Sequence, residues 1–209
     1  MNKYHKYPRT RHAPWSRSKT DDDKVHPTMK QFEGQHVIVT EKMDGENTTM
    51  YSDNIHARSI DSRNHPSRNW VKQLHGEIAH MIPEGMRVCG ENMYAKHSIA
   101  YDDLSSFFLV FNIWDGDLCL SWKDTLEWCE LLGLDHVRVL YNDTYDEEAV
   151  RSLWTPNDAD DIEGYVIRFS GEVRRSEFSD KFAKFVRKGH VQTDEHWMFK
   201  EVESNKLRE

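Results

Sequence analysis

The sequence predicts an α+β fold in which antiparallel sheets are covered by helices on the outside. Short apolar runs rich in β-branched and aromatic residues recur along the chain between turn residues, which is typical of strands. Helical periodicity appears in only a few places, and regular strand–helix–strand units are rare. The chain has 209 residues, of which 37% are hydrophobic and 11% aromatic, so it can bury a substantial core.

The first 30 residues are basic, interrupted by proline and without periodicity, and they predict an arm laid over the core. A buried strand is expected next, at 36–40. The turn Asp44-Gly45 and a second strand at 48–51 follow it and complete a predicted hairpin. Further strands are expected at 55–59, 86–90, 107–114, 137–141, 162–169 and 182–187.

The clearest helix is expected at 121–132. Ser121 is suited to its N-cap, and Gly133 stands where a left-handed residue commonly ends a helix. Weaker helical patterns occur at 70–82 and 145–154. Thr193 is suited to cap a last helix.

Composition leaves the question of a nucleic-acid partner open. The formal net charge is −8, but Lys and Arg gather at 3–19 and 174–188, and phosphate binding depends on where these residues lie. The three cysteines have neither CxxC spacing nor a disulfide pattern, which favours a reducing compartment and hence the cytoplasm. No apolar run is long enough to span a membrane, so no membrane association is expected.

Lys42 is the residue most suited to covalent chemistry. It directly follows the strand at 36–40, which would hold it rigidly, and it precedes the turn Asp44-Gly45, where glycine lets the backbone approach a ligand closely. A lysine amine becomes a usable nucleophile when desolvation or neighbouring cations, including a metal ion, lower its pKa. Its target would be the α-phosphate of a nucleotide. The alternative is an ordinary lysine at the end of a strand.

The segment Lys42-Met43-Asp44-Gly45-Glu46-Asn47 resembles motif I, K-x-D/H-G-x-N, of the covalent nucleotidyltransferases, which comprise RNA ligases, DNA ligases and capping enzymes. The remaining motifs follow in order. Arg58 stands where these enzymes have an arginine after the hairpin, and Glu91 matches the acidic residue of motif III near the ribose. The string at 90–99 is similar to the RNA ligase branch, and to phage RNA ligase 2 in particular.

Three further motifs complete the resemblance. The segment 107–114 resembles motif IIIa, which implies that Phe111 stacks on the purine, although Asn112 replaces the more usual aspartate. Glu163 begins a match to motif IV and is implied as the carboxylate that binds magnesium or manganese. Lys184 resembles the first cation of motif V, where it would contact the α-phosphate.

The second cation of motif V departs from the K-x-K pattern of the family. Val186 occupies its position, so Arg187 or Lys188 would have to replace it. The resemblance therefore implies a catalytic set and a nucleotide-binding set. The catalytic residues are Lys42, Arg58, Lys184 and Arg187. The residues expected to bind the nucleotide are Glu41, Lys42, Asn47, Glu91, Phe111, Glu163 and Lys184.

The resemblance implies an adenylyltransferase fold, an ATP-grasp-like ligase core with two antiparallel sheets around a nucleotide groove. Residues 1–209 would form a single nucleotidyltransferase domain with an arm at 1–30, a catalytic core at 31–190 and a short tail at 191–209. Only about 20 residues follow Lys188, too few for the OB domain of DNA ligases and capping enzymes. We do not expect the helical domain that many RNA ligases add, either. We therefore expect a minimal ligase core.

The implied activity is ATP-dependent joining of an RNA 3′-hydroxyl to a 5′-phosphate through lysyl–AMP and RNA–adenylate intermediates. Its substrates would be ATP and RNA ends, in a nicked duplex or in single strands, with magnesium or manganese as the metal. A DNA ligase or a guanylyltransferase is the alternative within the enzyme class. A module that binds nucleotide or RNA ends without chemistry is the alternative outside it. Oligomeric state is left open.

Overall fold

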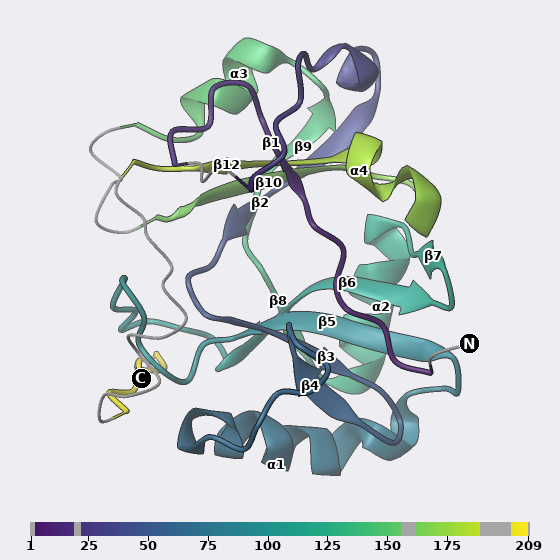
Figure 1. Ribbon diagram of the computed structural model, residues 1–209, viewed down its shortest axis with the longest axis vertical. Helices are drawn as coiled ribbons and strands as arrows, with labels where there is room; N and C mark the ends of the chain where they lie inside the picture. The colour runs from purple at the N-terminus through teal and green to yellow at the C-terminus, as the bar shows by residue number, and fades with distance from the viewer. Residues whose placement is uncertain (1–2, 19–21, 156–161, 189–201, 209) are drawn as a thin grey trace.

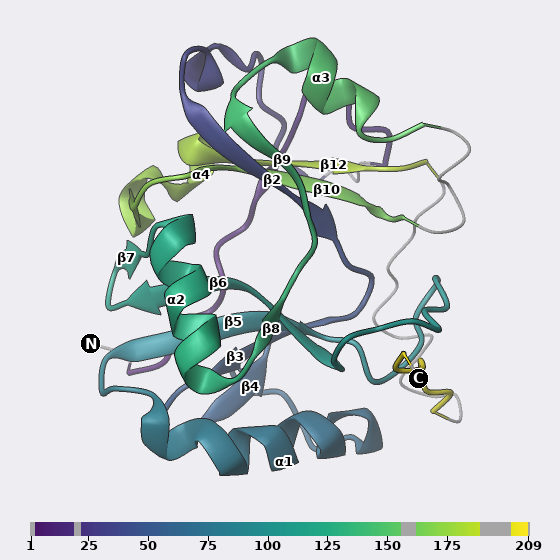
Figure 2. The same ribbon diagram turned by 180° about the vertical axis from the view of Figure 1, so that it is seen from behind.

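A computed structural model describes residues 3–18, 22–155, 162–188 and 202–208. Two β-sheets lie one above the other, and helices cover their outer faces (Figure 1). The view from behind shows the same arrangement, with α3 above the first sheet and α1 below the second (Figure 2). This architecture confirms the predicted α+β class with two sheets.

The first sheet has five strands in the order β1-β12-β10-β2-β9. All neighbours are antiparallel except β1 and β12, which are parallel. The strand bounds are Arg11–His12 (β1), Phe182–Val186 (β12), Gly164–Phe169 (β10), His36–Lys42 (β2) and Val139–Thr144 (β9).

The second sheet has the order β11-β7-β6-β5-β3-β4, and the short strand β8 runs parallel to β6. The bounds are Val173–Arg174 (β11), Leu118–Cys119 (β7), Phe108–Asp115 (β6), Met86–Asn92 (β5), Glu46–Met50 (β3), Ile55–Ala57 (β4) and Asp135–His136 (β8). The prediction of a hairpin around Asp44-Gly45 is wrong, because β2 and β3 belong to different sheets. The turn therefore carries the chain from one sheet to the other.

Among the described residues, three of the four helices fall close to their predicted ranges, and α4 was not predicted. The helices are α1 (Asn69–Ile78), α2 (Trp122–Leu132), α3 (Glu147–Ser152) and α4 (Phe178–Lys181), with short 3-10 turns at Lys30–Phe32, Pro66–Arg68, Ala79–Met81 and Arg175–Glu177. Both predicted ends of α2 are confirmed. The Ser121 hydroxyl accepts the N–H of Asp124, and Gly133 has a φ of 64°, in the left-handed region. The helix predicted to start at Thr193 lies outside the described residues.

The alternation of side chains along β2 explains why the reactive lysine lies between the sheets. Val37 and Val39 are buried in the core cluster that includes Val150 of α3. Ile38 belongs to another cluster, shared with residues of the second sheet. Because strand side chains alternate between faces, Lys42 lies on the same face as Ile38, turned toward the second sheet.

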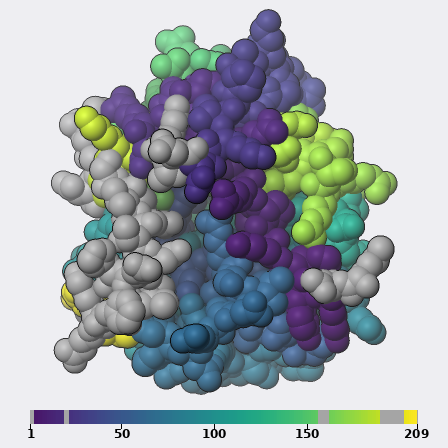
Figure 3. Space-filling view, in the orientation of Figure 1, coloured from purple at the N-terminus to yellow at the C-terminus, as the bar shows by residue number. Residues whose placement is uncertain are grey.

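The N-terminal arm is more closely integrated than a segment laid over the core. Its residues Arg11–His12 add a strand to the first sheet. The preceding residues descend to the second sheet, where the N–H of His5 donates to the Tyr51 hydroxyl at 2.8 Å. The space-filling view shows this segment crossing the front of the molecule from the upper to the lower sheet (Figure 3). The arm therefore joins the two sheets.

The structure also addresses the membrane expectation. In the part of the chain that the structure describes, no helix combines the length and apolar character needed to cross a bilayer.

Candidate active site

A cavity of about 830 Å³ lies between the two sheets. Its wall includes β2, β12 and β10 from the first sheet and β3, β5 and β6 from the second. The N-terminal arm, the loop at 57–68 and the segment at 95–98 complete the wall. Of the predicted site residues, Glu41, Lys42, Asn47, Arg58, Glu91, Phe111 and Lys184 line this cavity.

Lys42 lies at the end of β2, directly beside the strand that follows Glu163. In the antiparallel pairing of β2 with β10, Lys42 is opposite Gly164. The Lys42 ammonium donates to the Glu163 carboxylate at 2.6 Å, and Glu163 is only 1% exposed. A buried carboxylate with a charged partner forms a strong hydrogen bond. The predicted nucleophile and the predicted metal ligand are thus in direct contact.

The charge around Lys42 differs from the sequence-based expectation. Burial acts to lower the pKa of Lys42, but the carboxylates of Glu163, Glu91 and Asp44 outweigh burial and raise that pKa above its ordinary value. In this state the lysine is a protonated partner of Glu163. The sequence led us to expect that desolvation would lower the pKa of Lys42. The effect of the three acidic groups near the amine is larger, so this pKa is raised instead.

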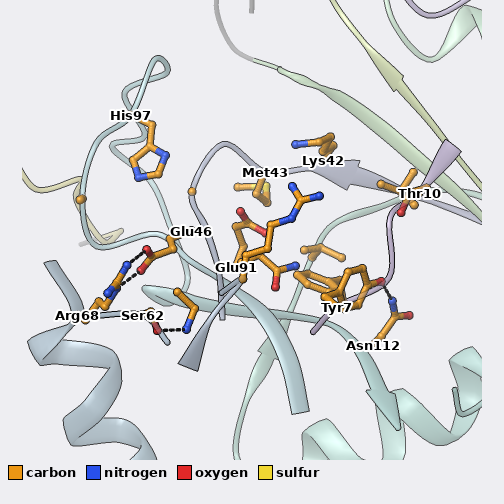
Figure 4. A pocket seen from close by; sticks show the side chains of 18 of the residues that line it. Tyr7, Thr10, Lys42, Met43, Glu46, Ser62, Arg68, Glu91, His97 and Asn112 are labelled. Carbon is orange, nitrogen blue, oxygen red and sulfur yellow. Dashed lines mark hydrogen bonds and ion pairs between the residues drawn. The ribbon is translucent and has the colours of Figure 1, made fainter. Parts of the chain in front are cut away.

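Glu91 faces the same region from the second sheet. It lies on β5 opposite Asn47 of β3, so the strand pairing places the two predicted nucleotide-binding residues side by side. Burial raises the pKa of Glu91 to about 8, and Glu163, Asp44 and Glu46 add to this effect, while Lys42 opposes it. The Asn47 Oδ1 atom is buried and makes no hydrogen bond within the described residues. Figure 4 shows Glu91 across the cavity from Lys42.

The turn after Lys42 is held from the opposite side by the chain around 98–101. Asp44 is fully buried, and its Oδ2 atom accepts the N–H groups of Ser98 and Ile99 at 2.8 and 2.9 Å. Its own N–H donates to the Tyr101 hydroxyl at 3.1 Å. A side chain on Gly45 would meet Asn92 O at 2.6 Å, so glycine is required here for packing between strands.

Two cations lie near Lys42. Lys184 comes from β12 and Arg58 follows β4, and both line the cavity. Burial lowers the pKa of Lys184 to about 8, and repulsion from Lys42 and Arg58 adds to that lowering, while Asp23 opposes it at 3.9 Å. Fixed cations of this kind bind phosphate groups without reorganisation. The site therefore has a positive side and an acidic side.

Arg187, the predicted second cation of motif V, is not brought to the cavity wall. Its N–H donates to the carbonyl of Glu163 at 3.0 Å, and it is absent from the residues that line the cavity. Lys184 and Val186 share one face of β12, because alternate residues of a strand point the same way. A residue one position further along therefore points elsewhere.

Phe111, the predicted stacking residue, lies on β6 and is half-buried at the cavity. Tyr7 of the arm packs edge-on against it, with 5.2 Å between ring centroids. The Tyr7 hydroxyl accepts from the amide of Asn112, as the dashed line in Figure 4 marks. Asn112 in turn accepts from the buried Arg168 at 2.5 Å. The residue that replaces the usual aspartate thus joins the arm to a buried arginine.

Several cavity residues escape sequence reasoning. Tyr7, Pro8 and Thr10 come from the arm, and Val202 and Glu203 come from the tail. Neither segment has periodicity or a recognisable motif. Both reach the cavity through contacts with residues about a hundred positions away, for example the contact of Tyr7 with Asn112. An aromatic residue next to proline in an otherwise polar arm is the one signal that could have found Tyr7.

Two carboxylates that line the cavity, Glu41 and Glu46, are each paired with an arginine. Glu41 accepts from Arg138 at 2.9 Å, and burial raises the pKa of Glu41 despite this partner. Glu46 accepts hydrogen bonds from Nε and Nη2 of Arg68, with Nε at 2.7 Å (Figure 4). Such two-point pairs fix geometry as well as charge.

The donor set suits a hard divalent cation. No group of three or more His, Cys, Asp or Glu side chains with ligand spacing occurs within the described residues. Magnesium, however, commonly uses only one or two protein carboxylates together with waters and substrate phosphates. Glu163 and Glu91 both interact with Lys42, although only Glu91 is among the residues that line the cavity. The residues present therefore fit a magnesium or manganese ion that the nucleotide helps to bind.

Solved structures that share this fold include several RNA ligases. A Naegleria gruberi RNA ligase with PPi has a TM-score of 0.57 at 20% identity, over 88% of this chain and 59% of that one. An archaeal ATP-dependent RNA ligase has a TM-score of 0.59 at 18% identity, over 88% of this chain and 48% of that one. A Naegleria gruberi RNA ligase mutant with ATP and Mn reaches 0.56 at 18% identity, over 86% of this chain and 58% of that one. This chain thus spans about half to three-fifths of their length.

These likenesses show that the chain has the fold of the solved RNA ligases. The family model for RNA ligase matches residues 35–186, well over half of the chain. The chain therefore belongs to the RNA ligase family, as its ordered motifs predicted. No curated protein sequence matches it.

Proposed function

We propose that this chain is an ATP-dependent RNA ligase that joins RNA 3′-hydroxyl and 5′-phosphate ends, with Lys42 as the nucleophile. The observation that carries the proposal is the position of the Lys42 amine. It enters the cavity beside the buried Glu163 carboxylate, and the cations Lys184 and Arg58 line the same cavity. An amine, a metal-binding carboxylate and phosphate-binding cations are the groups that nucleotidyl transfer requires.

The first step forms a bond between the Lys42 nitrogen and the α-phosphorus of ATP. The bond to the leaving oxygen breaks and pyrophosphate departs. The Lys42 ammonium gives up two of its three protons to solvent, so the phosphoramidate nitrogen keeps one. Lys184 and Arg58 would hold the phosphate oxygens, because both cations line the cavity. Asn47, with its buried unsatisfied oxygen, would accept a hydrogen bond from a ribose or an RNA terminus.

The second and third steps pass AMP onward. A 5′-phosphate oxygen of the RNA attacks the α-phosphorus, the bond to Lys42 breaks, and the amine regains a proton. The 3′-hydroxyl then attacks the RNA 5′-phosphorus and AMP leaves. Glu163 would hold the magnesium or manganese ion. That ion supplies positive charge against the negative charge that develops on phosphate oxygens.

Phe111 and Glu91 are the proposed contacts of the nucleoside. Phe111 presents a half-buried ring to the cavity, suited to stack on a purine. Glu91, with its pKa raised to about 8, holds a proton at neutral pH and can both donate and accept hydrogen bonds to ribose hydroxyls. Glu41 lines the same cavity from the first sheet. Arg187 has the weakest support as a catalytic residue, since it lies off the wall.

The wider setting of the protein is also part of the proposal. We propose one nucleotidyltransferase domain over 1–209, because the arm and the tail both contribute to one cavity. All three cysteines are buried and free, which supports a reducing compartment such as the cytoplasm. RNA ends, in nicked duplexes or single strands, are the proposed partners.

Intact-mass spectrometry with ATP and magnesium tests the central claim. The chain should gain the mass of one AMP, peptide mapping should find it on Lys42, and Lys42→Ala should gain none. Lys123→Ala is the matched control, because Lys123 is an exposed lysine on α2 and should leave the adduct unchanged. Protein purified with AMP already attached is first stripped with pyrophosphate.

The alternatives give different results in the same experiment. An adduct with GTP in place of ATP would identify a guanylyltransferase, and preferential sealing of nicked DNA over RNA would identify a DNA ligase. No adduct with ATP or GTP, under either metal, would contradict covalent transfer and leave a module that only binds nucleotide or RNA ends.

A further inference from the structure

The tail at 202–208 packs against the wall of the cavity, far along the chain from Lys42. Backbone bridges join Ala95 to Ser204 and Leu104 to Leu207. The Lys96 N–H donates to the carbonyl of Glu203 at 2.8 Å. In Figure 1 the tail lies beside the chain that follows β5. The tail is thus paired with the segment at 93–104 along its length.

Asn205 is the centre of this pairing. It is 3% exposed, and its side-chain amide donates to Met93 O at 2.7 Å and to Ala95 O at 3.4 Å. Its side-chain oxygen accepts the N–H of Tyr101 at 3.0 Å. One buried side chain therefore binds both ends of the segment 93–101. A buried amide with these bonds satisfied is costly to remove, because the carbonyls and the N–H would lose their partners.

The segment that Asn205 holds is the same one that holds the turn after Lys42. Tyr101 accepts the N–H of Asp44 through its hydroxyl, at 3.1 Å. Ser98 and Ile99 donate to the Asp44 carboxylate. Asp44 is two residues from Lys42, so a shift of 93–101 moves the turn from which the nucleophile extends.

We propose that Asn205 is a positioning residue for the transfer of AMP to Lys42. It acts through Tyr101 and Asp44, and it touches neither the nucleotide nor the lysine. The proposal rests on the proposed ligase function, because it concerns the step in which Lys42 attacks ATP. A misplacement of about 1 Å far from the chemistry can slow a reaction about a hundredfold.

The test compares two reactions of the same protein. Attack on ATP needs the Lys42 amine in position, whereas sealing of chemically pre-adenylylated RNA does not use the amine. For Asn205→Ala we expect formation of the AMP adduct at saturating ATP to slow by at least about tenfold, and sealing of pre-adenylylated RNA to change by less than about threefold.

Tyr101→Phe is the second variant, and it decides the matter if Asn205→Ala does not fold. It removes one oxygen atom, the acceptor of the Asp44 N–H, and leaves the bond between Asn205 and the Tyr101 backbone in place. It should show the same selective loss. Leu207→Ala is the control on the tail, since its side chain is 41% exposed and its backbone bridge is kept.

Each outcome has one meaning. A selective loss of adduct formation supports the positioning role. Equal losses in both reactions would overturn it and leave a contribution to folding alone, and so would unchanged adduct formation in both variants. If the unaltered protein forms no adduct, the proposed ligase function fails instead, which separates the two claims.

Discussion

The ammonium group of Lys42 lies 2.6 Å from the carboxylate of Glu163, a residue 121 positions further along the chain. The two meet because β2 and β10 are neighbours and Gly164 is opposite Lys42. In this pair the lysine is protonated and unreactive, since only a neutral amine can attack phosphorus. Glu163 is thus the partner of the resting lysine and also the residue that we propose binds the metal ion.

Replacing Glu163 with glutamine should affect metal dependence most. The substitution Glu163→Gln keeps the shape of the side chain but not its charge, so adduct formation should slow on the order of a hundredfold at low magnesium. Excess manganese should restore part of the rate. The measurement is the rate of AMP attachment against metal concentration, with Glu177→Gln, an exposed glutamate paired with Lys181, as control. An unchanged metal dependence would remove Glu163 from the metal site.

Nucleotide binding should depend on pH through Lys184. Its pKa is lowered to about 8, from an ordinary value of 10.5, and the protonated form is the one that binds phosphate. Affinity for ATP without metal should therefore be highest below pH 8 and should fall as pH rises through 8. Binding near pH 8 should take up protons, because a bound phosphate raises this pKa again.

Calorimetry of ATP binding in buffers of different ionisation enthalpy measures that uptake. Lys184→Met should weaken binding about tenfold or more at pH 7, since a hydrogen bond to a charged group is worth about 1.5–3 kcal/mol. It should also reduce proton uptake at pH 8. If Lys184→Met kept the full uptake, another group such as Glu91 would be responsible.

The replacement of aspartate by Asn112 leaves Arg168 with a neutral partner. Arg168 is 2% exposed, it donates to the Asn112 and Leu120 oxygens, and it has no ion pair among the described residues. Asn112→Asp should raise the free energy of unfolding by about 1–3 kcal/mol, because it supplies a charged acceptor. Urea denaturation measures the change. The control substitution Asn142→Asp, at an exposed position, should change the free energy of unfolding by less than about 0.5 kcal/mol. If Asn112→Asp destabilised the protein, the argument that Arg168 gains from a charged acceptor would be wrong.

Gly164 is required by the close approach of β10 and β12. A Cβ atom there would lie 2.0 Å from the carbonyl oxygen of Phe185. Gly164→Ala should destabilise the protein by about 3 kcal/mol or more, since backbone must shift to relieve the overlap. Gly76→Ala in α1 is the matched substitution, because nothing lies within 4 Å of its added Cβ. It should stabilise by about 0.5–1 kcal/mol through helix propensity. Equal effects of the two changes would refute the steric argument.

The elements of this fold were predictable where local chemistry determines them. The helix at Trp122–Leu132 was recognised with both ends, because Ser121 and Gly133 act within one turn of it. The strands at β2, β5, β6, β10 and β12 were recognised because buried strands consist of continuous apolar runs. The short strands β7, β8 and β11 were missed, since two residues leave no periodicity.

By itself the sequence determined the family and the identity of most residues at the cavity, because ordered motifs record side-chain type and spacing. Only the tertiary structure decided how those residues act on one another. It paired Lys42 with Glu163, made Asp44 an acceptor for Ser98 and Ile99, brought Tyr7 to Asn112, and brought Asn205 to Tyr101. Each of these contacts joins residues more than 50 positions apart, and their energies depend on distance and burial in space. No local pattern contains that information.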